Sequence, residues 1–260
     1  MAIYSHSKLS TFEQCKQKYK FRYIDKIKPD FEASIEAHLG KIVHDALEWL
    51  YGNVLNNKIP TLDQIIEQYS NNWQEKYKEN CKIVKQNLKP EDYFNKGVKF
   101  LINYYLKNQP FKDGTLEMEK RVFINLDDNS PNKIIGYIDR LVHNKETDTY
   151  EIHDYKTGGF LPAQDKFDTD RQLALYGIAI KQLFGQHKEI LLVWHYLDHN
   201  KKIVSTRTNQ QLEELKQEIL ELIEEVEKTQ EFHPNKSALC DWCEFKSNCP
   251  GWKIQTKLKF

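Results

Sequence analysis

The sequence lacks any apolar run close to the roughly 20 residues that a transmembrane helix requires, so we expect no membrane-spanning segment. Its opening, MAIYSHSKLS, has no apolar core of the kind found in secretion signals. It also lacks net charge, because 38 Lys and Arg residues balance 38 Asp and Glu residues, and global charge gives no argument for nucleic acid. Internal repeats and low-complexity linkers are missing too. We therefore expect a cytoplasmic globular protein without a membrane partner.

Charge is nevertheless distributed unevenly along the chain. Residues 8–28 hold seven Lys or Arg residues against two acidic residues and are interleaved with aromatic residues, a pattern that favours a phosphate-facing surface. Residues 210–231 hold eight glutamates and two lysines, which is typical of a solvated helix face.

The chain has five cysteines, which are placed unevenly along the sequence. Cys240, Cys243 and Cys249 lie close together, whereas Cys15 and Cys81 lie far away in the sequence. Disulfides are rare in cytoplasmic proteins, so the cysteine pattern indicates a metal site.

The first half of the chain reads as mostly helical. Apolar positions recur with the helical period in residues 39–55. Further helices are expected at 62–80 and 91–108, with Pro90 at the boundary between them, and at 8–25, where Ser7 or Ser10 would be the cap.

The second half begins with segments rich in β-forming residues. Strands are expected at 116–126, 133–144 and 149–157, joined by short turns that indicate an antiparallel meander. A helix at 168–184, a hairpin of strands at 189–197 and 201–208, a helix at 209–230 and a cysteine-bearing tail follow. This order predicts an α/β fold in which helices flank a mixed sheet.

Two acidic residues fall on neighbouring strands of this expected meander. Asp154 and Lys156 share one face of a strand, about 7 Å apart. A hairpin brings Asp139 beside Asp154, and two carboxylates that close repel each other unless a divalent cation binds them. Oxygen ligands favour Mg²⁺ or Mn²⁺, and a nearby ammonium group can orient water or stabilise charge on a phosphate. The alternative is a surface ion pair with Arg140 and Lys156 as the cations, because Asp-x-Lys is a common and short signal.

GYIDR followed by YEIHDYKTG resembles the PD-(D/E)XK nuclease superfamily, and within it the RecB-like branch. That branch combines Gly-x-x-Asp with an apolar strand that ends in Asp/Glu-x-Lys. LGKIVHDALE resembles its histidine-bearing helix, RQLALYGIAI its Gln-x-x-x-Tyr helix, and YSHSKLSTFEQCKQKYKFRYI the first segment of members that carry an iron–sulfur cluster. Ile138 stands where the superfamily name places proline, and residues 56–114 are not covered.

The resemblance implies a fold and an activity. The fold is a restriction-endonuclease-like αβββαβ core within one domain spanning 1–260, with a helical N-terminal part, a helical insertion at about 56–114 and an iron–sulfur tail at about 232–260. The activity is hydrolysis of DNA phosphodiester bonds, with an exonuclease favoured, in repair, recombination or processing.

The resemblance also assigns roles to individual residues. His44, Asp139, Asp154 and the backbone carbonyl of Tyr155 would bind Mg²⁺ or Mn²⁺, and Lys156 would position or activate the attacking water. Gln172 and Tyr176 would orient the substrate backbone. Each residue also has an ordinary interpretation: His44 as a structural histidine, Gln172 as a solvated side chain and Tyr176 as a core residue. Either Glu119 or Glu117 is a further acidic candidate.

Cys240-x2-Cys243-x5-Cys249 supplies three soft ligands and needs a fourth for zinc or for a [4Fe–4S] cluster. His233 would complete a zinc site, and Cys15 would complete a cluster. The resemblance implies the cluster, with Cys15, Cys240, Cys243 and Cys249 as ligands. Cys81 would be a small apolar residue of the insertion.

Two alternative functions remain at this stage. One is a CRISPR adaptation nuclease that trims spacer precursors, and the other is an inactive DNA-binding or scaffold subunit with the nuclease fold. The expected partners are DNA, as single strands or duplex ends, and a helicase or CRISPR adaptation protein. The presence of His44, Asp139, Asp154 and Lys156 argues against the scaffold, which has no need for that set.

Overall fold

The computed structural model describes residues 2–78, 81–127 and 132–253. Its first half contains the elements β1 (Ile3–Ser5), α1 (His6–Gln14), α2 (Lys16–Tyr19), η1 (Lys20–Ile24), α3 (Ile35–Leu55), α4 (Leu62–Lys76) and α5 (Pro90–Asn108). Its second half contains the elements β2 (Thr115–Asn125), β3 (Lys133–Asn144), β4 (Thr149–Lys156), α6 (Gln164–Asp168), α7 (Arg171–Phe184), β5 (Ile190–Tyr196), η2 (Leu197–His199), β6 (Lys201–Ser205), α8 (Asn209–Lys228), η3 (Ala238–Trp242), η4 (Lys246–Asn248) and α9 (Pro250–Lys253). Part of the turn expected after the first strand of the meander, and the last seven residues of the tail, lie outside these ranges.

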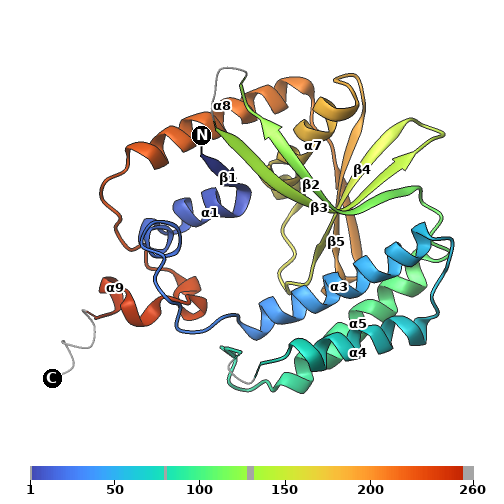
Figure 1. Cartoon of the computed structure of the whole chain (residues 1–260), viewed down its shortest axis with the longest axis horizontal. Helices are drawn as coiled ribbons and strands as arrows, with labels where there is room; N and C mark the ends of the chain where they lie inside the picture. The colour runs from blue at the N-terminus through green and yellow to red at the C-terminus, as the bar shows by residue number, and fades with distance from the viewer. Residues whose placement is uncertain (1, 79–80, 128–131, 254–260) are drawn as a thin grey trace.

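A mixed sheet forms the centre of the molecule (Figure 1). The strands run in the order β1-β3-β4-β5-β6, and β2 pairs with the other edge of β3. The antiparallel meander β2–β3–β4 and the hairpin β5–β6 confirm the predicted strands. The crossover through α7 makes β4 and β5 parallel. The three-residue strand β1, which pairs in parallel with β3, is too short for its sequence pattern to reveal it.

Two groups of helices cover the sheet from opposite sides. One hydrophobic cluster joins α1, α7 and α8 to the sheet, with Leu173, Ala179 and Ile219 among its fully buried members. The second cluster lies among α3, α4 and α5, around Leu47 and Tyr69. This arrangement confirms the predicted α/β class with a mixed sheet between helices.

The helix boundaries follow local capping chemistry. Ser34 caps α3 by accepting a hydrogen bond from the amide of Ala37, so the helix begins four residues before the predicted start. Pro90 is the first residue of α5, where its missing N–H costs nothing, which agrees with the predicted boundary. The helices α4 and α5 lie within residues 56–114, and the description of that region as an insertion stays a prediction.

The predicted single helix at 8–25 was wrong. The backbone of Cys15 is extended, with φ −162° and ψ 107°, and this residue separates α1 from α2. The cap is Ser5, whose side chain accepts a hydrogen bond from the amide of Lys8, rather than Ser7 or Ser10. The apolar pattern continued through the break, so only the tertiary structure shows that the chain turns at Cys15.

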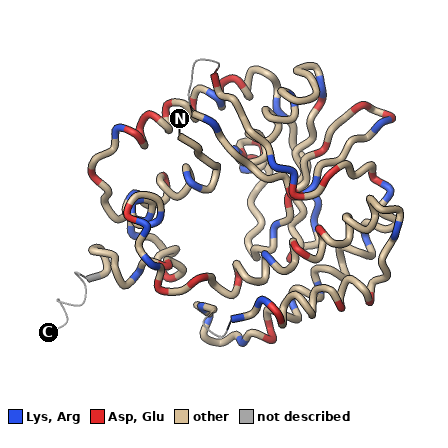
Figure 2. The backbone as a smooth tube through the Cα atoms, in the orientation of Figure 1, with Lys and Arg blue, Asp and Glu red and all other residues tan. Residues whose placement is uncertain are grey.

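Acidic and basic segments are interspersed along the whole backbone (Figure 2). Several cations of the basic N-terminal run form ion pairs within the chain. Lys16 lies 2.7 Å from Glu225 on α8, and Lys18 and Arg22 both pair with Glu244 in the tail. Much of the charge expected to face phosphate is therefore neutralised by the chain itself. Among the described residues, no helix combines the length and apolar character needed to cross a bilayer.

Candidate active site

The strands β3 and β4 separate at the residues that carry the acidic motif. Their pairing runs from Asn144–Thr149 to Arg140–His153, and beyond it β4 continues against β5 alone. The carboxylate of Asp139 lies at this divergence, where its Oδ2 accepts a hydrogen bond from the amide of Tyr155 at 2.8 Å. The Asp139 side chain thus takes the place of a backbone hydrogen bond between the two strands.

His44 on α3 approaches this point from the side of the sheet that α3 covers. Its Nε2 donates to the carbonyl oxygen of Tyr155 at 2.8 Å, and its Nδ1 lies 3.5 Å from Asp139 Oδ2. Potential ligand atoms of His44, Glu119 and Asp139 all lie within 4.8 Å of one another. The structure therefore brings together the predicted histidine, aspartate and carbonyl oxygen.

Glu119, not Glu117, is the additional carboxylate at the site. The β2–β3 ladder skips the Glu119–Asp139 position, and Glu119 has a φ of +48°, which turns its side chain toward His44. Glu117 forms an ion pair with Lys120 instead. A cavity of about 330 Å³ opens beside His44 and Glu119, and the further carboxylates of Asp45 and Glu48 line it. Lys41 lines the same cavity, and Asp45 forms ion pairs with Lys41 and Lys76, so part of this negative charge is compensated within the chain.

Asp154 and Lys156 occupy the other side of the divergence. Lys156 Nζ donates to Asp154 Oδ1 at 3.0 Å and to Gln172 Oε1, on α7, at 3.1 Å. Asp154 Oδ2 is buried, and although Lys156 Nζ lies 2.8 Å away, no described residue donates to this oxygen with hydrogen-bond geometry. A buried carboxylate oxygen without a donor is unfavourable, and a bound cation removes that cost.

Electrostatics at the site also favour a cation. Burial, reinforced by the charge of Asp154, raises the pKa of Asp139 to about 7, against the opposing effects of His44 and the Tyr155 amide. Burial lowers the pKa of Lys156, but the charge and hydrogen bond of Asp154 outweigh it and leave that pKa raised. Lys156 is therefore an ammonium group at neutral pH. The donor set of one imidazole, carboxylates and a carbonyl fits Mg²⁺ or Mn²⁺.

Tyr176 packs behind the site instead of opening toward solvent. Its ring lies against Gly136 on β3, where an added Cβ would come within 2.2 Å of a ring carbon. Its hydroxyl interacts with Gln172 and with the backbone of Tyr137. Tyr176 thus holds α7 and β3 together, and its predicted role in orienting substrate stays a prediction.

Sequence reasoning missed a buried polar network behind the two catalytic strands. Arg140, which is 1% exposed, donates to His153 Nδ1 at 2.7 Å and to the hydroxyl of Tyr155 at 2.9 Å. It also pairs with Asp113, so the alternative in which Arg140 is the surface partner of the site aspartates was wrong. Burial, together with the Arg140 charge, holds the pKa of His153 well below its ordinary range. The sequence feature that could have indicated this network is the presence of polar residues within strands that are otherwise apolar.

His6 is a second residue near the site without an assigned role. Burial, followed by the charges of Arg171 and Lys156, lowers its pKa to about 4, so the imidazole is neutral. Its Nε2 lies 3.2 Å from the hydroxyl of Ser10. In the sequence, His6 is part of the N-terminal segment that resembles cluster-bearing family members, and no role was predicted for it.

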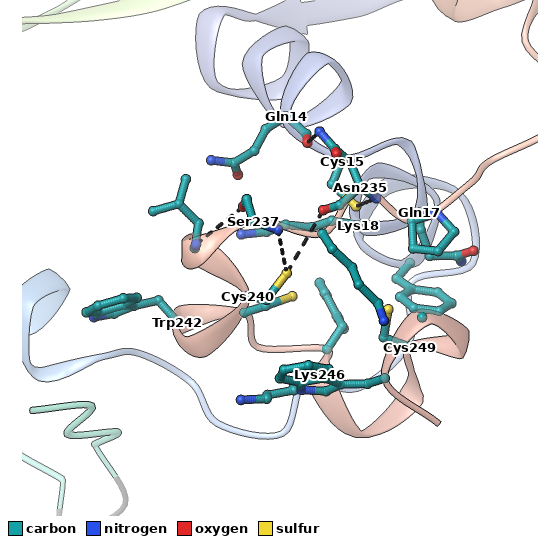
Figure 3. Close-up of a pocket in the computed structure, with 18 residues that line it drawn as sticks. Gln14, Cys15, Gln17, Lys18, Asn235, Ser237, Cys240, Trp242, Lys246 and Cys249 are labelled. Atoms are coloured by element: carbon teal, nitrogen blue, oxygen red, sulfur yellow. Dashed lines mark hydrogen bonds between the residues drawn. The ribbon is translucent and has the colours of Figure 1, made fainter. Parts of the chain in front are cut away.

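The four cysteines grouped from the sequence line one cavity of about 150 Å³, shown in Figure 3. Cys15 comes from the break between α1 and α2, and Cys240, Cys243 and Cys249 come from the tail. Among the described residues, no three cysteine sulfurs lie within 4.8 Å of one another, so the cysteines are not clustered as metal ligands and the iron–sulfur cluster stays a prediction. His233, the alternative zinc ligand, is exposed and contacts Glu231. The remaining cysteine is half-buried against the helical cluster of α3, α4 and α5.

Comparisons with known proteins bear on the family and the fold of the chain. The family model of the PD-(D/E)XK nuclease superfamily, whose members use divalent metals, matches residues 3–250. A presumed exonuclease from Eubacterium rectale has a similar fold, with a TM-score of 0.53 and 14% identity over 94% of this chain and 86% of that one. The protein SSO0001 aligns at 16% identity over 94% of this chain and 93% of that one, but its TM-score of 0.39 is too low to carry an argument. No curated protein matches. The chain belongs to the PD-(D/E)XK nuclease superfamily.

Proposed function

We propose that this protein is a DNA exonuclease of the RecB-like branch that requires Mg²⁺ or Mn²⁺. The observation that carries the proposal is the grouping of His44, Glu119 and Asp139 where β3 and β4 separate, with the bonded pair of Asp154 and Lys156 beside them. Asp154 Oδ2 is a buried carboxylate oxygen to which no described residue donates a hydrogen bond. The pKa of Asp139 is raised by burial and by the charge of Asp154. Both features are unfavourable in a purely structural site and are relieved by a bound cation.

Five groups of the site would hold the metal ion, namely His44, Asp139, Asp154, Glu119 and the Tyr155 carbonyl. When bound, the ion supplies Lewis acidity and neutralises phosphate charge.

Lys156 then acts as a hydrogen-bond donor rather than a base, because it keeps its proton at neutral pH. Its ammonium group lies beside Asp154 and would orient a water molecule or stabilise the negative charge that develops on a phosphate. Gln172 holds that ammonium group in place through the 3.1 Å hydrogen bond.

The four cysteines support a second cofactor. We propose that Cys15, Cys240, Cys243 and Cys249 ligate a [4Fe–4S] cluster, because all four residues line one cavity. A cluster there would connect the first helices to the last segment of the chain.

The catalytic proposal is tested by a nuclease assay on end-labelled single-stranded and duplex DNA with Mn²⁺, using anaerobically purified protein. We expect the wild type to shorten labelled strands and Lys156→Ala to lose at least about a hundredfold in rate, the typical effect of removing one preorganised donor. Lys188→Ala is the matched control, because Lys188 pairs with Asp148 far from the site. Equal cleavage by Lys156→Ala and wild type would show that the lysine has no catalytic role, and an inactive wild type would favour the scaffold alternative.

A further inference from the structure

The outward face of β2 and β3 exposes large aromatic side chains. On β3, Ile134 and Ile138 point into the core, whereas Tyr137 points outward and is 50% exposed. On β2, Phe123 also points outward and is 47% exposed, and Arg121 pairs directly with Tyr137 across the two strands. Aromatic side chains on a sheet face are normally covered, so this exposure needs an explanation.

This face leads directly to the metal site. Tyr137 precedes Asp139 by two residues, so the two side chains share one face of β3 about 7 Å apart. His44 reaches Asp139 from the same side of the sheet, because α3 lies there. Beyond the site, the described residues leave β2 and β3 open on this side, which explains the exposure of Tyr137 and Phe123.

The face combines aromatic rings with a cation that has no carboxylate partner. The guanidinium of Arg121 lies 4.7 Å from the ring centroid of Phe123. Across residues 2–78, 81–127 and 132–253, none of the ion pairs involves Arg121. Arg121 therefore differs from Lys16, Lys18 and Arg22, whose charges are neutralised within the chain.

We propose that Arg121, Phe123 and Tyr137, which we call the β2–β3 platform, bind unpaired nucleotides of a DNA strand next to the cleavage site. Bases stack on Tyr137 and Phe123, and Arg121 faces a phosphate. Stacking on aromatic rings needs open base faces, which single strands offer and a base-paired duplex conceals. The inference rests on the proposed nuclease function and adds its substrate class: single-stranded DNA, or a duplex end that has been unpaired.

The test measures binding of wild type and platform variants to two labelled strands of equal length, by fluorescence anisotropy in EDTA so that no cleavage occurs. One strand is oligothymidine, and the other has the same backbone without bases. We expect Tyr137→Ala and Phe123→Ala each to weaken oligothymidine binding about tenfold, the order typical of one lost stacking contact. Both variants should bind the abasic strand as wild type does, and Tyr137→Phe should restore oligothymidine binding. Arg121→Ala should weaken binding of both the oligothymidine and the abasic strand, because it removes a phosphate contact.

Phe184→Ala is the matched control, since Phe184 is a partly exposed aromatic residue that stacks on Tyr150 at the opposite end of β4. Thermal melting of each variant shows whether it is folded. Unchanged oligothymidine binding by both folded alanine variants would overturn the platform while leaving the nuclease proposal intact. Variants that alter self-association in light scattering but not DNA binding would instead show a protein interface. A wild type that binds and cleaves no DNA would overturn both proposals.

Discussion

At the scale of single residues, the site is defined by charges that its own fold does not satisfy. Asp139 and Asp154 are close enough for the charge of Asp154 to raise the pKa of Asp139, and the ammonium group of Lys156 bonds to Asp154. In the sequence, the resemblance to the nuclease superfamily singled out these three residues and His44. It could not choose between Glu119 and Glu117, because the choice depends on a local change of backbone direction at Glu119.

The raised pKa of Asp139 gives a pH-dependent prediction for the metal-free protein. The folded-state pKa of about 7 lies above the ordinary value near 4, so ionisation of this carboxyl opposes folding. The free-energy cost of ionising Asp139 in the folded state grows from about pH 4 to about pH 7 and is constant above pH 7. Asp139→Asn removes the charge but keeps an oxygen for the Tyr155 amide. We therefore expect D139N to raise the melting temperature in EDTA by several degrees at pH 8 and much less at pH 4.5.

Addition of Mn²⁺ provides the complementary measurement. It should stabilise the wild type at pH 8 and leave D139N nearly unchanged, because the variant lacks one carboxylate ligand. The same melting-temperature difference between the two proteins at both pH values would contradict the assignment of an unfavourable charge to Asp139.

At the scale of secondary-structure elements, the site depends on contact between α7 and β3. Gly136 leaves room for the ring of Tyr176, and this contact positions the turn of α7 that carries Gln172 beside Lys156. The motif of a glycine, an aspartate and a distant Gln-x-x-x-Tyr helix was visible in the sequence. The sequence did not show that Gly136 leaves room for the ring of Tyr176, because these two positions come together only when α7 packs on β3.

Gly136→Ala tests this contact. The added methyl group would lie 2.2 Å from the Tyr176 ring, so α7 must shift, and we expect a loss of about 1–3 kcal/mol in unfolding free energy together with reduced cleavage. Gly158→Ala is the control for stability, because nothing lies within 4 Å of its added Cβ. The double change Gly136→Ala with Tyr176→Ala should cost less stability than the sum of the two single changes, because the clash that the methyl group causes is absent once the ring is removed. If Gly136→Ala were as stable as the wild type, the contact between Gly136 and the Tyr176 ring would not be tight.

At the scale of the whole molecule, the two ends of the described chain are joined beside the cysteine cavity. The amide of Gln17 donates to the carbonyl oxygen of His233 at 3.2 Å, and Asn235 donates to Gln14 and Cys15. A ligand held by Cys15 and the tail would close a loop of more than two hundred residues, where closure constrains the unfolded chain most.

Iron and acid-labile sulfide analysis of anaerobically purified protein tests the proposed cluster. We expect about four iron and four sulfide per chain for a [4Fe–4S] cluster. Cys15→Ser should lose most of the iron and make the tail more sensitive to protease, whereas Cys81→Ser should keep the full iron content, because Cys81 lies outside the cavity. Stoichiometric zinc without iron would rule out the cluster.

The sequence by itself determined the features that are encoded locally. Alternation and helical period gave the meander, the hairpin and most helices, and short motifs gave Asp139, Asp154, Lys156 and His44, because these signals lie within a few consecutive residues. Only the tertiary structure decided the break at Cys15, the choice of Glu119, the buried Arg140 network and the exposed face around Tyr137. These features arise from contacts between residues far apart in the chain, and burial and ligand geometry are properties of those contacts rather than of any single segment.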